Sequence, residues 1–199
     1  MKGTRHTDSN PIRIFSLTPS RWADLEKLFG PRGACAGCWC MYWRLAHSDF
    51  KKKMGAANKR AFKKIVAAGE TPGLVAYSGR EPVGWCAVAP RETYARLQNS
   101  RTLAPADDHP VWSVVCFFVV RGSRRRGVTV ALLRAAVEFA RKRGAKMVEG
   151  YPIAPKTKPM PDAFAWTGLE GAFLKAGFKE VARRSATRPI MRFSISRAV

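Results

Sequence analysis

Acidic residues are scarce in this chain of 199 residues. It contains 14 Asp and Glu against 36 Lys and Arg, which gives a formal net charge of +22. An excess of this size creates a positive field that attracts polyanions, so an anionic cofactor and nucleic acid are both conceivable partners. Most basic residues stand in short, scattered groups that are typical of a solvated surface. Charge alone therefore does not choose between these partners.

Long apolar runs are absent as well. No run approaches the ~18 residues that a membrane span requires, and residues 1–11 lack the apolar core of a secretory signal. We therefore expect a cytoplasmic protein with no membrane partner, whose residues 1–9 are disordered. Five cysteines, an odd number, are present. Without an export signal they are expected to be reduced thiols rather than disulfides.

Internal repeats and long Pro-, Gly- or Ser-rich linkers are also missing, so nothing marks a domain boundary. Hydrophobic residues make up 46% and charged residues 25% of the chain, close to the ordinary globular mixture. We therefore expect residues 1–199 to form a single domain.

Strand-like and helix-like patterns alternate along the chain and predict an α/β fold. Strands are expected at 12–17, 74–77, 82–88, 111–120, 146–151, 178–183 and 190–195, and helices at 19–29, 58–68, 91–97, 127–143 and 168–176. The run 111–120 is too continuously apolar for a half-exposed strand, which predicts a central strand buried on both faces. The helix after it connects it to 146–151, which predicts a βαβ unit with a parallel strand pair. Residues 35–44 fit neither pattern.

The join between the central strand and its helix is the most informative segment. It reads Arg124, Arg125, Arg126, Gly127, Val128, Thr129. A helix start leaves several backbone N–H groups unpaired and carries a partial positive charge, so phosphate oxygens bind there. Gly127 lets the backbone approach a ligand, and the arginines add donors and charge. The alternative is an ordinary turn with solvated arginines.

The stretch from Val111 to Pro152 resembles the GNAT superfamily of N-acetyltransferases in order and spacing. The loop pattern of that family is Arg or Gln, two residues, Gly, one residue, then Gly or Ala. Arg124, Gly127 and Thr129 occupy the three defined positions, and the threonine is a departure. Similar segments continue through 172–178, so that residues 111–183 match best. The resemblance implies a mixed central sheet of about six to seven strands, flanked by helices, with splayed central parallel strands.

The resemblance also implies a reaction, the transfer of an acetyl group from acetyl-CoA to a primary amine by direct attack in a ternary complex. The backbone of Phe117, Phe118 and Val119 would line the pantetheine arm, and an N–H there would hold the thioester carbonyl. The acceptor would be a small-molecule or peptide amine, and the enzyme a monomer or homodimer. Two other readings stay open, a basic nucleic-acid-binding module and an inactive acyl-CoA-binding regulator.

The general acid and base do not carry over directly from the family. Many members use a tyrosine in the late helix, four residues before a Gly-Phe pair, and Phe173 stands there in this chain. A phenyl ring cannot donate a proton, so Tyr151, beside the expected gap, is the substitute candidate, unless it is simply a packed aromatic residue. Glu149 precedes it by two residues, on the same face of the strand, and is the candidate base. Ser113 stands where some members carry a glutamate.

Three residues are candidates for binding the acceptor. Trp39 and Trp43 fall in the region that usually shapes the acceptor pocket of GNAT enzymes, and aromatic faces attract cations. Asp162, in the loop before the late helix, could bind the ammonium group of the acceptor. All three are hypotheses.

Cysteine spacing raises the question of a metal. Cys35, Cys38, Cys40 and His47 supply four potential zinc ligands. However, Cys38 and Cys40 are too close for the common paired arrangement, and no second pair follows. We therefore expect thiols and no metal.

Overall fold

The computed structural model describes residues 10–155 and 162–196, so the expectation for residues 1–9 lies outside the described residues. One mixed sheet holds seven strands in the order β1-β2-β3-β4-β5-β7-β6. The central pair β4–β5 is parallel, and every other neighbouring pair is antiparallel. The strands are β1 (Ile12–Ser16), β2 (Gly73–Ser78), β3 (Glu81–Pro90), β4 (Trp112–Val119), β5 (Met147–Gly150), β6 (Lys179–Arg183) and β7 (Pro189–Ser194). The predicted mixed sheet is confirmed.

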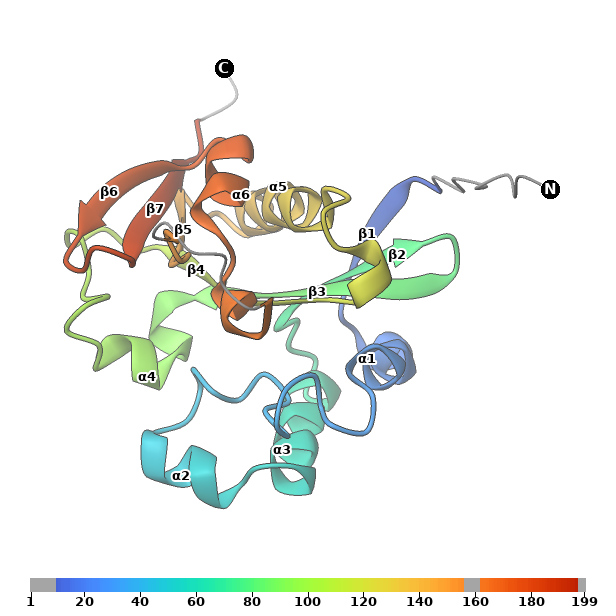
Figure 1. The fold of residues 1–199 in the computed structure, drawn as a ribbon. Coiled ribbons are helices and arrows are strands. Elements are labelled where there is room, and N and C mark those ends of the chain that lie inside the picture. The colour runs from blue at the N-terminus through green and yellow to red at the C-terminus, as the bar shows by residue number, and fades with distance from the viewer. Residues whose placement is uncertain (1–9, 156–161, 197–199) are drawn as a thin grey trace.

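Helices cover both faces of the sheet (Figure 1). On one side lie α1 (Trp22–Phe29), α2 (His47–Lys52), α3 (Ala56–Ala67) and α4 (Ala95–Gln98), and on the other lie α5 (Val128–Arg141) and α6 (Glu170–Lys175). Short 3-10 helices are η1 (Pro19–Arg21), η2 (Arg91–Thr93), η3 (Arg121–Ser123) and η4 (Asp162–Thr167). Each side has its own hydrophobic core, one beneath α1 and α3 and one beneath α5. Over the described ranges, no helix has both the length and the apolarity to cross a bilayer.

The structure departs from the sequence prediction mainly before residue 60. The helix expected from residue 19 begins as η1, and the hydroxyl of Thr18 contacts that of Ser20 (2.9 Å) instead of capping a backbone N–H. Helix α2 was not predicted, because its sequence HSDFKK has no apolar periodicity. The segment 35–44 is irregular, and both Trp39 and Cys40 adopt positive φ angles.

Strands β4 and β5 pair only briefly and then separate. Their register contains three pairs and ends where Val114 meets Gly150. Strand β5 stops there, whereas β4 continues to Val119 alongside β3. The predicted splay of the central parallel strands is therefore present, and it begins just after Val114.

A bulge interrupts β4 at the start of this splay. Cys116 pairs with Ala87 and Val114 with Val88, so Val115 is an extra residue on β4. The carbonyl of Val115 accepts a hydrogen bond from Nε1 of Trp43 (3.0 Å). A bulge of this kind bends the strand and redirects its groups, here at the point where the two strands part.

Candidate active site

Backbone groups of β4 face the side from which β5 has withdrawn. Beyond the bulge, Val120 donates its N–H to β3 (3.0 Å). Residues of an antiparallel strand alternate in the direction of their hydrogen-bonding groups, so those of Phe118 also face β3, whereas those of Phe117 and Val119 face the opposite side. From that opposite side, Nε of Arg124 donates to the carbonyl of Val119 (3.1 Å).

The side chains of these strand residues belong to the two cores. The ring of Phe117 packs edge-on against Phe173, with centroids 6.1 Å apart, and the ring of Phe118 packs against Phe29 on the other face (5.7 Å). Val119 is half-buried beside the α5 core. The predicted cofactor-binding stretch 117–119 can therefore offer its backbone, but hardly its side chains, to a ligand in the splay.

The loop that follows carries the predicted pyrophosphate site. The chain enters the left-handed region at Arg125 (φ 59°) and again at Gly127 (φ 79°, ψ 0°), which precedes the first residue of α5. A Cβ on Gly127 would meet nothing within 4 Å, so the backbone conformation, and not crowding, requires glycine there. No side chain caps α5, and the N–H groups of Val128 and Thr129 open its first turn.

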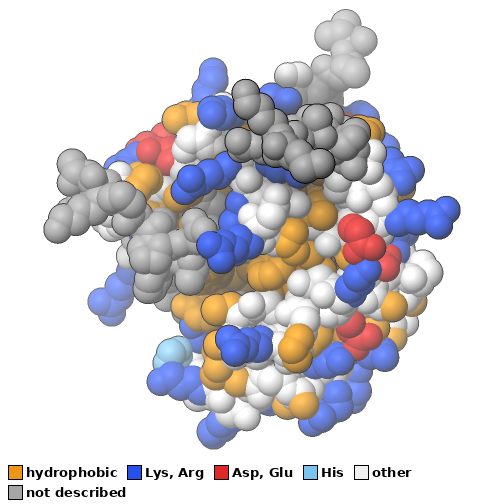
Figure 2. Space-filling view, turned by 45° about the vertical axis from the view of Figure 1, so that its right-hand side comes forward, with side chains coloured by type: hydrophobic (Ala, Val, Ile, Leu, Met, Phe, Trp, Pro, Cys, Tyr) orange, Lys and Arg blue, Asp and Glu red, His pale blue; other side chains and the backbone are white. Residues whose placement is uncertain are grey.

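Positive charge surrounds this helix start. Arg124, Arg125 and Arg126 are exposed, Thr129 is half-buried, and Val128 is buried beneath them. Figure 2 shows hydrophobic side chains in a hollow on one face of the molecule, with Lys and Arg around it. Open helix N–H groups beside several guanidinium groups suit a phosphate-bearing ligand.

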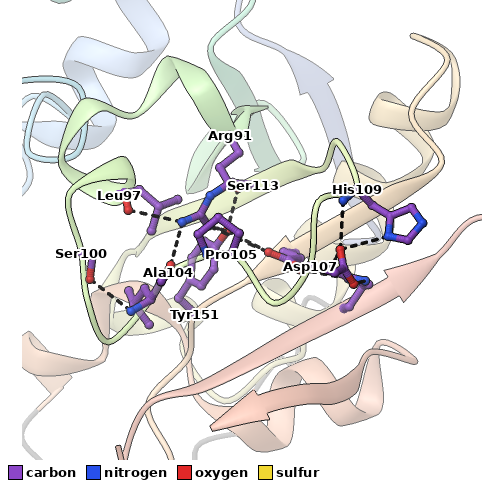
Figure 3. Close-up of polar contacts among 12 residues, drawn as sticks. Arg91, Leu97, Ser100, Ala104, Pro105, Asp107, His109, Ser113 and Tyr151 are labelled. Carbon is purple, nitrogen blue, oxygen red and sulfur yellow. Dashed lines mark hydrogen bonds and ion pairs between the residues drawn. The ribbon is translucent and has the colours of Figure 1, made fainter. Parts of the chain in front are cut away.

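Tyr151 and Glu149 lie together on the α1–α3 side of the sheet, as strand alternation predicted. Figure 3 shows Tyr151 beside Arg91 and Ser113. The hydroxyl of the fully buried Tyr151 contacts Nη1 of Arg91 (2.7 Å), Oγ of Ser113 (2.8 Å) and Oε2 of Glu149 (3.2 Å). Arg91 in turn donates from Nη2 to the carbonyl of Leu103 (2.7 Å). The phenol is thus one node of a buried polar network.

Glu149 links this network to two arginines and a further carboxylate. Its Oε1 accepts from Nε (2.9 Å) and Nη2 (2.7 Å) of Arg192, while Oε2 lies 4.0 Å from Nη1 of Arg91. Arg192 also holds Asp107, at 2.6 and 3.0 Å. Positive and negative side chains therefore alternate in space, in the order Arg91, Glu149, Arg192 and Asp107. Such alternation is what allows a carboxylate to be buried as deeply as Glu149, which is 1% exposed.

Two ionisations are strongly perturbed in this network. Burial, reinforced by the charge of Glu149, raises the pKa of Tyr151 far above its ordinary value. The hydrogen bonds from Arg192 hold the pKa of Asp107 well below its usual range. At neutral pH Tyr151 is therefore a protonated phenol, which can donate a proton but not accept one.

A pocket of about 240 Å³ opens onto the network. Arg91, Asp107, Glu149 and Arg192 contribute to its wall, together with the loop 105–111. Neither arginine was among the site residues predicted from the sequence. Arg192 does interrupt an apolar strand pattern, which is a visible signal for a buried partner, whereas nothing local distinguishes Arg91.

The three residues predicted to bind the acceptor lie in different surroundings. Trp43 is held against β4 by its bond to Val115, and its ring lies 5.7 Å from that of Trp166. Trp39 is 4% exposed and stacks on Trp22 in the core (6.1 Å). Asp162 begins η4, but its side chain is not among those described. Of the two tryptophans, Trp43 is the one that donates a hydrogen bond to the central strand.

Phe173 occupies a position next to the splay. It is fully buried, and a Cβ on Gly150 would fall only 2.0 Å from its ring. The ring therefore covers the last residue of β5, opposite Phe117. The position where many GNAT enzymes have tyrosine is beside the point where the strands separate, and here it carries no hydroxyl.

The cysteine-rich segment does not assemble a metal site. Within residues 10–155 and 162–196, no three His, Cys, Asp or Glu side chains converge to hold an ion. Cys35 is exposed, and His47 contacts Arg96 through Nδ1 (3.0 Å). All five cysteines are unpaired thiols.

Comparison with known proteins places the chain in a family. Residues 38–152 match the model of the acetyltransferase (GNAT) family. Because the match spans more than half of the chain, the protein belongs to this family. No curated protein matches the sequence.

Solved structures show the same fold at low identity. PaiA N-acetyltransferase from Thermoplasma acidophilum, in complex with coenzyme A, has a TM-score of 0.52 at 12% identity, over 93% of this chain and 99% of its own. YncA from Salmonella typhimurium, a putative acetyltransferase with its cofactor acetyl-CoA, has a TM-score of 0.53 at 12% identity, over 95% and 96%. A GNAT-family acetyltransferase from Streptococcus agalactiae has a TM-score of 0.55 at 11% identity, over 94% and 96%.

Proposed function

We propose that this protein transfers an acetyl group from acetyl-CoA to a primary amine by direct attack in a ternary complex. The observation that carries the proposal is the geometry of β4, whose Phe117 and Val119 backbone groups face the splay that leads to the start of α5. Family membership supports it. Structures of the same fold also bind the ligand, since PaiA was solved with coenzyme A and YncA with acetyl-CoA.

The residues present fit coenzyme A along its length. The first-turn N–H groups of α5 and the side chains of Arg124, Arg125 and Arg126 would hold the pyrophosphate. The pantetheine arm would run along the β4 backbone between Phe117 and Val119. In this pose the N–H of Phe117 donates to the thioester carbonyl and stabilises the oxyanion that forms on attack, an effect of about 100- to 1,000-fold in kcat for one such donor.

Proton transfer falls to Glu149 and Tyr151 in this proposal. Glu149, on the wall of the pocket, takes the proton that the attacking amine loses. Tyr151 donates its phenolic proton to the departing thiolate. The 3.2 Å hydrogen bond between the two then lets Glu149 return a proton to Tyr151, so that both regain their starting states. The buried arginines keep Glu149 in place throughout.

The acceptor is a small-molecule or peptide amine. Trp43 is positioned to shape its site, because it packs on the central strand at the bulge. An acceptor role for Trp39 and Asp162 remains a prediction. Aromatic faces near the reacting amine would favour bulky or cationic acceptors.

The direct test combines cofactor binding with turnover. Calorimetry at moderate salt should show saturable binding of acetyl-CoA, and thiol release should appear with some members of a panel of polyamines, amino acids and lysine peptides. Binding without turnover on any amine would instead indicate a regulator. Salt-steep binding to RNA, with no affinity for acetyl-CoA, would indicate a nucleic-acid-binding module and would overturn the proposal.

A further inference from the structure

The fold joins two groups of basic residues that the sequence keeps apart. One group ends α2 and enters the turn after it, and the other belongs to α3. The backbone connects them, because the N–H of Asn58, in the first turn of α3, donates to the carbonyl of Lys53 (2.8 Å). All six side chains are exposed, and together they form what we call the α2–α3 basic surface: Lys51, Lys52, Lys53, Arg60, Lys63 and Lys64.

The turn between α2 and α3 is held on the irregular segment 35–44. The carbonyl of Gly37 accepts hydrogen bonds from the N–H of Gly55 (2.9 Å) and from Nδ2 of Asn58 (3.3 Å). A Cβ on Gly37 would overlap the backbone of Gly55, so the close approach of the two segments requires glycine there. The α2–α3 basic surface therefore stands on a backbone that is tied to the rest of the domain.

Helix α3 turns one face to the core and the other to solvent. Phe62 and Val66 are each 1% exposed on the inner face. Every exposed residue of this helix is either an alanine or a basic residue. Basic residues three or four positions apart lie about 5–6 Å from one another on a helix. The small alanines between them leave room for a bulky partner to reach the charges.

Acidic residues are almost absent from this surface. Residues 47–67 contain seven Lys and Arg and one acidic residue, Asp49, whereas the whole chain has 36 against 14. The seventh cation, Lys59, pairs with Glu26 (2.7 Å). Among the described residues, no carboxylate lies within ion-pair distance of the other six. Positive charge is thus more concentrated here than in the chain as a whole, which favours an anionic partner.

A membrane surface and a nucleic acid are the two polyanions to compare. A helix that binds a membrane inserts large apolar side chains between the lipid headgroups. In α2, α3 and the turn between them, Met54 is the one large apolar residue that is exposed. The single strands of a nucleic acid are held largely by stacking of their bases on aromatic side chains, and none is exposed on this surface. Lysines beside small residues instead suit the phosphates of a double helix, whose backbone is bound without contacts to the bases.

We propose that the α2–α3 basic surface binds double-stranded nucleic acid through its phosphate backbone, without reading the base sequence. A duplex carries one negative charge per about 1.7 Å of its axis, and a helix of the length of α3 spans about 18 Å, so each cation meets a phosphate. Helices α2 and α3 lie on the side of the sheet away from α5 and α6 (Figure 1). The duplex and coenzyme A therefore occupy different sites, and this binding does not depend on acetyl transfer.

The test measures binding of the whole protein to labelled duplexes of RNA and of DNA, each of about 20 base pairs, at salt concentrations from about 50 to 200 mM. Six phosphate contacts predict that log K falls with log[salt] with a slope of about −5. A variant that combines Arg60→Gln, Lys63→Gln and Lys64→Gln removes three contacts. The slope should become shallower by about 3, and the affinity should fall by on the order of 100-fold at about 100 mM salt.

Two further variants accompany it. The combination of Lys51→Gln, Lys52→Gln and Lys53→Gln should have the same effect through the other half of the surface, so the test holds even if the α3 variant is unstable. The matched control combines Lys142→Gln, Lys175→Gln and Lys179→Gln, three exposed lysines at the ends of α5 and α6 and in β6. It loses the same amount of charge and should bind the duplexes as the parent protein does.

Three results would overturn the proposal. Equal losses of affinity in the control and in the two surface variants would show attraction by net charge alone. Displacement of the duplex by saturating coenzyme A would place the duplex on the loop 124–129. Tighter binding to vesicles of anionic lipid than to either duplex, lost in the same variants, would identify a membrane as the partner. Because binding is read without turnover, each result stands whether or not any amine is acetylated.

Discussion

Ser113 and Glu149 are direct partners across the parallel pair β4–β5, and the hydroxyl of Tyr151 touches both side chains, at 2.8 and 3.2 Å. Residue 113 is where some GNAT enzymes carry a glutamate. In this chain the carboxylate stands at the same level of the sheet but on the neighbouring strand. In the proposed mechanism a base on β5 takes the place of one on β4, and the pairing of these two residues supports assigning that role to Glu149.

Replacement of that carboxylate tests the assignment. Glu149→Gln keeps an oxygen for Arg192 but removes the proton acceptor, so kcat should fall by about 100- to 10,000-fold, the usual contribution of a general base. The affinity for acetyl-CoA, measured by calorimetry, should not change. The control is Glu138→Gln, which makes the same change at an exposed residue of α5 paired with Arg141. Equal kcat values for the two variants would remove Glu149 from the mechanism.

Substitutions at two glycines with the same conformation can distinguish an effect on cofactor binding from an effect on stability. Gly127 (φ 79°) directly precedes α5 and Gly144 (φ 80°) lies beyond its end, and a Cβ on either would meet nothing within 4 Å. Alanine at each position should therefore lower the free energy of unfolding by a similar amount, about 1–2 kcal/mol, in urea titrations. Only Gly127→Ala should also weaken the binding of acetyl-CoA. If both variants bind it as tightly as the parent protein, the loop does not hold the pyrophosphate.

Sequence patterns were sufficient to predict the structure where the apolar periodicity lies within a single strand or helix. The continuous apolar run placed β4 in the centre, and alternation placed Glu149 and Tyr151 on one face, both of which the structure confirms. The arginines of the network were not predicted, because Arg192 meets Glu149 only through the pairing of β5 with β7. The segment 35–44 was equally out of reach, since tertiary aromatic packing fixes its positive φ angles and no repeat in the sequence encodes them.

Alkaline titration should show the buried phenols resisting ionisation. Burial raises the pKa of Tyr94, burial and Glu149 raise that of Tyr151, and burial with Asp24 raises that of Tyr77. Since these folded values lie above the unfolded value of about 10, the associated stability is present below that pH and is lost as the pH rises through the folded values. Phenolate absorbance from these tyrosines should therefore appear together with loss of circular dichroism. Ionisation of all four tyrosines near pH ~10 in a folded protein would contradict this.

The two tryptophans offer a matched pair for acceptor selectivity. Trp43→Phe removes the donor to the bulge carbonyl of Val115, so we expect the KM ratios across the amine panel to change, with a stability cost of about 1–3 kcal/mol for the unpaired carbonyl. Trp39→Phe changes a ring that stacks in the core, and should affect the melting temperature more than selectivity. Unchanged selectivity in both variants would rule out an aromatic acceptor site in this segment.

Restoring the tyrosine of the family at position 173 is the most informative change near the thiolate. The edge of the Phe173 ring, including its Cζ atom, lies against Gly150, so the para position is near the end of β5, where the strands separate. A hydroxyl added there would be close to the departing sulfur, and we expect Phe173→Tyr to raise kcat and to rescue part of the activity that Tyr151→Phe loses. Phe178→Tyr is the control, since its ring is also buried and packs on Phe173, with ring centroids 5.1 Å apart. It should lower stability without any gain in rate. If Phe173→Tyr brings no gain in either background, proton donation to the thiolate does not limit the reaction, and Tyr151 is then a structural member of its network.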